Sequence, residues 1–363
     1  MLSILLSLWI SLFPASDLDE INHLFHVQQQ AINTNNMSGY VSTIYEDEHY
    51  RQEQKRWFKD AVSFIDPKSF QIKVKKYHFI SKSHYHAEII HSYRKNHKLY
   101  SFVRPVEMKK TKQGWKDADS LAYERKKRFI TVKYSDRNLL PESQKALTIL
   151  SLVSEKMVHK YSWNPRVVEV KLYHDPEVFR QSVKLSLPTW AGGWNEAKQS
   201  IKLVVGKSDT VSLTHGLAHE YTHQLLSDMT NDNAAYWLQE GAAMFYEAWF
   251  TKEKPEIEKN FHPFAISELE QMNLEQLPDN EASRYYISCY MRFKEIVQQH
   301  GEKQIAKAFR EMRNYPYIDE DSAVKQQETN KRTRHILQKN KLLPNKTNTL
   351  EDAYLNMSDK RVL

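Results

Sequence analysis

The stretch His219-Glu220-Tyr221-Thr222-His223 places two histidines four residues apart, with a glutamate directly after the first. In a helix, residues four apart share a face, so both imidazoles can point at one metal ion. Surrounding apolar residues predict a helix that begins near Thr210 or Ser212 and ends at the turn Asn231-Asp232-Asn233. The stretch therefore predicts a helical metal site, and zinc suits paired imidazoles of this kind.

A catalytic zinc site needs a third protein ligand and one open position. The metzincin pattern would place a glycine three residues and a histidine six residues after His223, but those positions hold Leu226 and Met229. A second helical run begins at Ala235, and Glu240 lies about a turn and a half into it. His223 lies about two turns before the end of the first helix, a distance similar to that of Glu240 from the start of the second. In an antiparallel helix pair Glu240 is therefore predicted to lie opposite His223.

The run Trp237-Leu238-Gln239-Glu240-Gly241-Ala242-Ala243 adds a second motif to the first. Together, the two motifs resemble the gluzincin zinc metallopeptidases of the peptidase MA-like families. The resemblance implies one Zn²⁺ ion held by His219, His223 and Glu240. It also implies that Glu220 is the general base that activates a zinc-bound water.

The resemblance covers roughly residues 140–315 and implies a mainly helical, zincin-type catalytic domain with a small edge-strand sheet. Residues 200–206 are predicted to form a strand, and the glycines of Ala191-Gly192-Gly193-Trp194 precede it. In gluzincins, an edge strand before the motif helix pairs with the extended backbone of the substrate. We therefore expect residues 200–206 to be that edge strand.

A further helix is predicted from residue 283 to near Gly301. The related families carry a Tyr-x-x-Ser pattern here, with the tyrosine near the metal, and Tyr285 with Ser288 matches that spacing. The resemblance thus implies that Tyr285 is catalytic and donates a hydrogen bond to the oxyanion. Tyr286 is its rival, and an ordinary core aromatic is the competing interpretation.

Two other polar residues lie at helical spacing from the motif. His215 is one turn before His219, and we interpret it as a surface residue or an outer contact of the site. Glu247 is seven residues after Glu240 and shares its face, which would allow it to orient a ligand. A solvated or ion-paired glutamate is the commoner arrangement, and we favour it.

The pattern changes before residue 137. Helical spacing over residues 18–62, broken at 33–39, precedes runs of period-two alternation that begin at residues 69, 85, 99 and 128. A helix followed by a curled antiparallel sheet resembles an NTF2-like or cystatin-like α+β domain, which we expect over residues 17–136. Such a domain could present the substrate, inhibit the catalytic domain or attach the protein to a partner.

Histidines are concentrated in this N-terminal region. They are His78, His84, His86, His91 and His97. His84 and His86 share one face of a strand, where they could bind a metal, but no carboxylate or cysteine in the sequence completes the set. We therefore favour solvated strand histidines.

Residues 2–13 form an apolar run followed by Pro14-Ala15-Ser16, which is typical of a signal peptide and its cleavage region. The run lacks a preceding Lys or Arg, Phe13 is large for its position, and the length is short for a membrane span. We expect residues 1–16 to be a signal peptide or a short membrane anchor, so that a bacterial host secretes the protein or holds it outside the cytoplasm. An amphipathic helix packed on the body is the alternative.

The 363-residue chain is long enough for two domains, and its 40% hydrophobic content is that of a globular protein. The net charge of +7 is moderate, and it is compatible with weak binding to a cell wall or lipid headgroups. No nucleic-acid module is present, so DNA and RNA binding are discounted.

The single cysteine, Cys289, excludes an internal disulfide and is predicted to be a buried thiol. Residues 316–363 are predicted to be a polar C-terminal tail with at best two short helical segments, either partly disordered or wrapped around the catalytic domain.

The sequence thus predicts an α+β protein that contains a zinc metallopeptidase domain acting on a peptide or protein substrate. The alternative is a non-catalytic, zinc-stabilised peptide-binding or sensor module. Glu220 argues against the alternative, because a pure binding site does not need that carboxylate. A third hypothesis is a cytosolic protein that processes itself.

Overall fold

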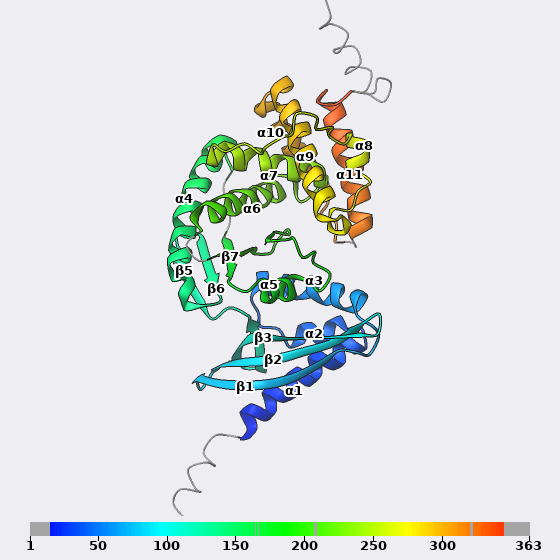
Figure 1. The fold of residues 1–363 in the computed structure, drawn as a ribbon. Helices are drawn as coiled ribbons and strands as arrows, with labels where there is room; N and C mark the ends of the chain where they lie inside the picture. The colour runs from blue at the N-terminus through cyan, green and yellow to red at the C-terminus, as the bar shows by residue number, and fades with distance from the viewer. Residues whose placement is uncertain (1–14, 164, 166, 207–208, 320–321, 345–363) are drawn as a thin grey trace, which may run out of the picture. The chain divides into compact units, whose positions relative to one another are not determined.

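The computed structural model describes residues 15–163, 165, 167–206, 209–319 and 322–344. Figure 1 traces the chain through two compact units, each assembled from separate stretches of sequence. The first unit draws on Met1–Leu147, Val167–Trp194 and Lys198–Asp209, and the second draws on Thr148–Arg166, Asn195–Ala197 and Thr210–Leu363.

The first unit begins with helices and continues into a four-stranded antiparallel sheet of order β1-β2-β3-β4. The helices are α1 (Ala15–Asn33), α2 (Met37–Ser42) and α3 (Glu48–Phe64). The strands are β1 (Gln71–Ser81), β2 (His84–Lys95), β3 (Lys98–Thr111) and β4 (Gly114–Asp119). Along β2, buried residues alternate with half-buried ones, so one face of the sheet is packed and the other is only partly covered.

Helices of the first unit cover the packed face of this sheet (Figure 1). Ile21, Leu24 and Phe25 recur at spacings of three and four along α1, and they form a core cluster with apolar side chains of β2 and β3. Trp57 and Phe58 of α3 belong to a second cluster, beside the first residues of β1. The helix and strand periodicities of the sequence therefore meet in two core clusters, and Ile72 packs against both of them.

A second sheet belongs to the same unit and has the order β5-β6-β7-β9-β8. Its strands are β5 (Tyr123–Lys127), β6 (Ile130–Tyr134), β7 (Val168–Tyr173), β8 (Gly193–Trp194) and β9 (Ile201–Val204), with helix α5 (Pro176–Val183) after β7. β7 is parallel to both β6 and β9, whereas β5 and β8 are antiparallel edge strands.

This second sheet corrects the expectation for residues 200–206. A strand forms there, as β9, but it is not the edge of the sheet, because Gly193 and Trp194 of β8 pair with its outer side. The sheet also belongs to the first unit and not to the unit that contains the helix of His219 and His223.

A buried ionic network explains why the second sheet belongs to the first unit. Lys171 of β7 lies 2.8 Å from Glu53 of α3 and 2.8 Å from Asp119 of β4. Lys202 of β9 lies 3.1 Å from Glu53, and Lys133 of β6 lies 3.2 Å from Asp119. All these side chains are largely removed from solvent, so each charge depends on its partners.

The pKa values of the network carboxyls follow from these contacts. Burial raises the pKa of Glu53, but the charges of Lys171 and Lys202 outweigh burial and hold it below its ordinary value. The pKa of Asp119 is likewise lowered, because Lys171 and Lys133 outweigh burial. Both carboxylates therefore stay ionised inside the protein.

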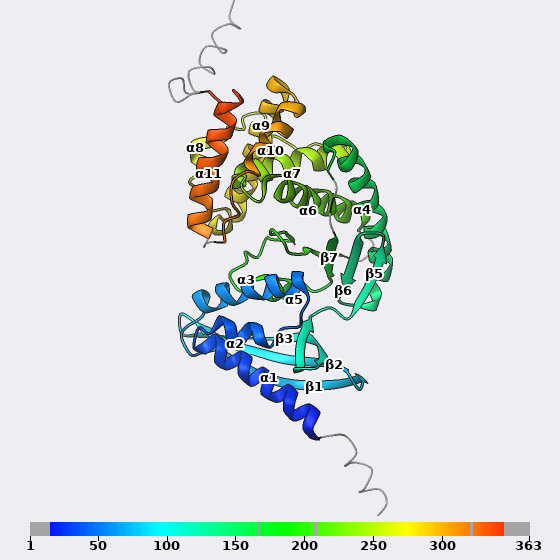
Figure 2. The same cartoon turned by 180° about the vertical axis from the view of Figure 1, so that it is seen from behind.

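The second unit is helical where the structure describes it. Helix α4 (Leu140–Tyr161) begins in the first unit and continues into the second. The others are α6 (Thr210–Thr230), α7 (Tyr236–Thr251), α8 (Ile266–Leu269), α9 (Asp279–His300), α10 (Glu302–Met312) and α11 (Ser322–Lys339). Figure 2 shows α6 and α7 side by side, with α9 next to α7.

Gly241 allows α7 and α9 to approach each other closely. A Cβ atom at Gly241 would lie 2.8 Å from Phe293 Cβ and closer still to the carbonyl oxygen of Cys289. Both obstacles belong to α9, and a carbonyl oxygen cannot rotate away as a side chain can. The glycine after Glu240 is therefore required by helix packing.

Helix α11, within the predicted polar tail, is fixed to the turn between α6 and α7. The hydroxyl of Thr333 accepts a hydrogen bond of 2.7 Å from the backbone N–H of Ala235. Lys325 forms an ion pair with Asp232 in the same turn. Helix α11 is thus part of the second unit, while residues 345–363 lie outside the described part of the chain.

The mixed α/β class with an antiparallel sheet is confirmed. The two compact units differ from domains divided at residue 136, because residues 137–147, 167–194 and 198–209 belong to the first unit. The apolar run at residues 2–13 lies outside the described residues. Among the described helices, none is both long and apolar enough to cross a membrane.

Candidate metal centre

Helix α6 presents the histidines of the motif on the face opposite its core-facing residues. Leu217, Tyr221 and Leu225 are fully buried and recur every four residues. His219 and His223 are offset from them by two residues, which is roughly half a turn. Their side chains are 16% and 12% exposed, so they are mostly buried but remain accessible to solvent.

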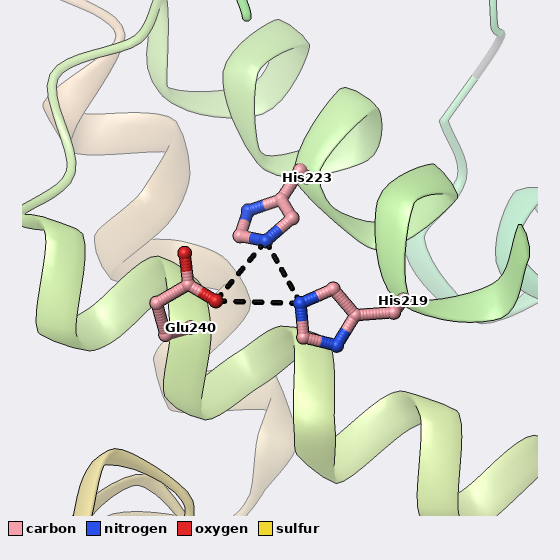
Figure 3. A group of neighbouring side chains, drawn as sticks. All are labelled: His219, His223 and Glu240. Atoms are coloured by element: carbon pink, nitrogen blue, oxygen red, sulfur yellow. Dashed lines mark hydrogen bonds and ion pairs between the residues drawn. The ribbon is translucent and has the colours of Figure 1, made fainter. Parts of the chain in front are cut away.

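Helix α7 brings Glu240 to these histidines, as the hairpin distances predict (Figure 3). Glu240 Oε2 lies 3.3 Å from His219 Nε2 and 3.3 Å from His223 Nε2. The two Nε2 atoms lie 3.2 Å apart. The three atoms therefore form a nearly equilateral triangle.

This triangle fits a metal ion. Atoms that surround one tetrahedral zinc at about 2.0–2.1 Å lie about 3.3 Å from one another. When both imidazoles are neutral, each Nε2 atom and the carboxylate oxygen carry a lone pair that can bind one central cation. Within the described ranges, no other three His, Cys, Asp or Glu side chains converge in this way.

The local charges are strongly coupled. Burial lowers the pKa of His219, but hydrogen bonds with Glu240 and Glu247 outweigh burial, so the pKa is raised well above its usual value. Burial raises the pKa of Glu240, but the nearby His223 and His219 outweigh it and lower the pKa. Glu240 is consequently an anion, as a zinc ligand must be.

Glu220 is a separate carboxylate at this centre. It is 8% exposed, and it accepts no hydrogen bond from the residues that the structure describes. Burial raises the pKa of Glu220, and the charges of His223 and His219 offset part of this rise. The side chain is therefore free to exchange a proton with a molecule in the site.

Glu247 contacts the site more directly than expected. Its Oε2 lies 3.0 Å from His219 Nδ1, and its Oε1 lies 2.8 Å from His215 Nδ1. Glu247 is ion-paired, as we favoured, but one of its partners is a candidate metal ligand. Its spacing of seven residues from Glu240 is the signal that pointed to this contact.

The two tyrosines of α9 have different surroundings. The Tyr286 ring centroid lies 6.3 Å from that of His219, and the charges of Glu240 and Glu220 act on its phenol. Tyr285 is fully buried, the charge of Glu240 acts on its phenol as well, and its hydroxyl interacts with Cys289. Ser288 accepts a hydrogen bond from the Phe264 backbone and so fixes the preceding loop. The Tyr286 ring thus contacts His219, and the choice between the two tyrosines stays a prediction.

Cys289 is a buried free thiol, as predicted.

In the first unit, Glu107 of β3 supplies the carboxylate that the histidine cluster lacked in the sequence. His84 Nε2 and His86 Nδ1 each lie 2.6 Å from a different oxygen of Glu107. The ligand atoms do not converge on one point, so this cluster is a set of ion pairs and not a preformed metal site. The contact depends on the β2–β3 register, which the sequence did not give.

Weak structural neighbours of this chain are NTF2-like proteins. An NTF2-like protein of unknown function from Shewanella oneidensis is 15% identical, with a TM-score of 0.25, and the match covers 28% of this chain and 98% of that protein. A candidate aromatic ring hydroxylase from Novosphingobium aromaticivorans is 13% identical, with a TM-score of 0.25, and the match covers 29% of this chain and 85% of that protein. Such low TM-scores carry no argument about function. No protein-family model and no curated protein matches the chain.

Proposed function

We propose that this protein is a zinc metallopeptidase of the gluzincin type, which hydrolyses a peptide or protein substrate in a zincin-type domain. The proposal rests on the convergence of His219, His223 and Glu240 at mutual distances of 3.2 to 3.3 Å. Three protein ligands leave one tetrahedral position open, as catalytic sites require, whereas structural zinc sites use four. The buried carboxylate of Glu220 beside them supplies a base.

A zinc ion held by these three residues would polarise the scissile carbonyl and lower the pKa of water. Glu220 is suited to take a proton from the attacking water, because none of its described neighbours donates a hydrogen bond to it. It then returns this proton to the leaving amine as the C–N bond breaks. Tyr286, close to His219, is suited to donate a hydrogen bond to the carbonyl oxygen as it gains charge.

The decisive variant is Glu220→Gln, which keeps the size of the side chain but removes the base. We expect it to retain zinc, measured by elemental analysis, and to lose peptide hydrolysis by a factor of about 10² or more. Cleavage of casein or a peptide library, with and without a chelator, gives the activity. Full activity in this variant would exclude the assigned role.

Control variants refine this experiment. His223→Ala removes a ligand and is expected to lose both zinc and activity. Tyr286→Phe is expected to lower kcat in the same assay, and Tyr285→Phe is expected to leave it unchanged. Zinc bound by the natural protein without cleavage of any peptide would favour the non-catalytic binding or sensor module instead.

We also propose that the protein acts outside the cytoplasm of its host, either secreted or held at the membrane. The support is the apolar run at residues 2–13 with its small-residue border. Fractionation of the host tests this, and recovery of the full-length chain only in the cytosol would contradict export.

A further inference from the structure

The histidines and glutamates of α6 and α7 alternate in a single row. His215, His219 and His223 recur every four residues along one face of α6. Glu240 lies between His223 and His219, and Glu247 lies between His219 and His215. The row therefore reads His223, Glu240, His219, Glu247, His215, and the candidate metal centre occupies only its inner end.

His219 has a different partner on each ring nitrogen. Its Nε2 faces Glu240 and His223, whereas its Nδ1 lies 3.0 Å from Glu247 Oε2. An ionised carboxylate only accepts hydrogen bonds, and a metal shared with Glu240 and His223 would use the Nε2 lone pair, so the one proton of the neutral imidazole belongs on Nδ1, where Glu247 accepts it. This tautomer leaves the lone pair on Nε2, the atom that points at the centre.

His215 holds Glu247 from the other side. Its Nδ1 lies 2.8 Å from Glu247 Oε1, so each carboxylate oxygen is engaged by a different histidine. The second nitrogen of His215 lies 3.0 Å from Glu253, whose side chain is 66% exposed. Glu247 itself is 23% exposed, and two partners on one rigid helix restrict its rotation.

We propose that Glu247 and His215 are positioning residues, which fix His219 as an Nε2 metal ligand and keep Glu247 from becoming a competing ligand itself. This inference rests on the proposed metal centre. Loss of such an outer carboxylate costs about 10- to 100-fold in metal affinity. The contribution of His215 acts only through Glu247, so its loss is expected to cost less.

The test compares zinc affinities, measured by competition with a chromophoric chelator. Glu247→Leu removes both acceptors and is expected to weaken zinc binding about 10- to 100-fold. Glu247→Gln retains one acceptor oxygen and should restore part of the affinity. Glu253→Gln, at the exposed end of the row, is the matched control and should leave the affinity unchanged.

A second measurement reports the tautomer itself. In the zinc-loaded protein, ¹⁵N NMR of His219 should show a protonated Nδ1, and Glu247→Leu should produce a mixture of tautomers. If Glu247→Leu does not fold, His215→Gln carries the test, with an expected loss of up to about tenfold in affinity. Zinc binding and a His219 spectrum that are unaffected by these variants would overturn the inference alone. Failure of the natural protein to bind zinc would overturn the proposed function as well.

Discussion

At Gly241, the absence of a side chain determines the position of a candidate ligand. The residue follows Glu240 directly, and it lies against the backbone of Cys289 and the side chain of Phe293. Helix propensity alone would favour alanine here by about 0.5–1 kcal/mol. The contact with α9 opposes that gain, because the Cβ would meet a backbone carbonyl.

Gly241→Ala is therefore expected to destabilise the protein, by about 1–3 kcal/mol, as overpacking does in other cores. It should also weaken zinc binding, because a displaced α7 carries Glu240 away from the histidines. Chemical denaturation and chelator competition measure the two effects. Gly192→Ala is the control, since no atom lies within 4 Å of the added Cβ. Equal stability of the two variants would contradict the close-packing argument.

Sequence spacing placed His219, His223 and Glu240 together because all three depend only on helix geometry and one short turn. The same reasoning could not choose between Tyr285 and Tyr286. Adjacent helical residues differ in direction by about 100°, and which of them faces the site depends on how α9 packs. That packing is set by Gly241 on another helix, which no local pattern in α9 records.

At the scale of elements, helix α11 binds the turn that joins α6 and α7, the two helices that carry the motifs. Thr333 accepts the hydrogen bond of the Ala235 backbone N–H, and both residues are fully buried. Ala235 begins α7, where no side chain of its own helix caps the backbone. The cap of α7 is thus supplied by a helix about 100 residues further along the chain.

Thr333→Val preserves shape but leaves the Ala235 N–H without an acceptor. A buried unsatisfied donor costs about 1–3 kcal/mol, and we expect a loss of stability in that range by urea denaturation. Thr329→Val is a matched control, because the Thr329 hydroxyl only donates to a carbonyl of its own helix. A loss no larger for Thr333 than for Thr329 would exclude the capping role.

The alternation that predicted strands β1, β2 and β3 came from apolar side chains facing one core. Helix α11 gave only a weak signal of this kind, because most of its buried positions are polar and its buried apolar residues, Ile336 and Leu337, come only near its end. Lys325, Thr329 and Thr333 are all buried, and they bind the backbone or charges of the turn before α7 or of α11 itself. Hydrophobic periodicity cannot detect a helix that docks through hydrogen bonds.

At the scale of the whole molecule, charged residues decide which stretches belong together. Lys171 and Lys202 lie within apolar strands, where a charged residue is usually read as facing solvent, yet each is 1% exposed. Their partners Glu53 and Asp119 come from before residue 137. A division at residue 136 separates these charges, and a sequence pattern gives no indication of such distant pairing.

A fragment of residues 17–136 is therefore expected not to fold by itself. Glu53 would lose both of its lysine partners and Asp119 would keep only Lys133, and breaking a buried pair costs about 3–5 kcal/mol. A fragment of residues 17–209, which restores both lysines, should fold. Circular dichroism and the dispersion of NMR signals compare the two. Cooperative unfolding of the shorter fragment would contradict this expectation.

The network also imposes an order on biosynthesis. A ribosome adds about 5–20 residues per second, so Glu53 and Asp119 emerge several seconds before Lys202. During that interval the nascent chain holds two acidic groups that its core cannot yet enclose. The first unit can complete its folding only when translation has reached the beginning of helix α6, and most of the second unit is still to be synthesised at that point.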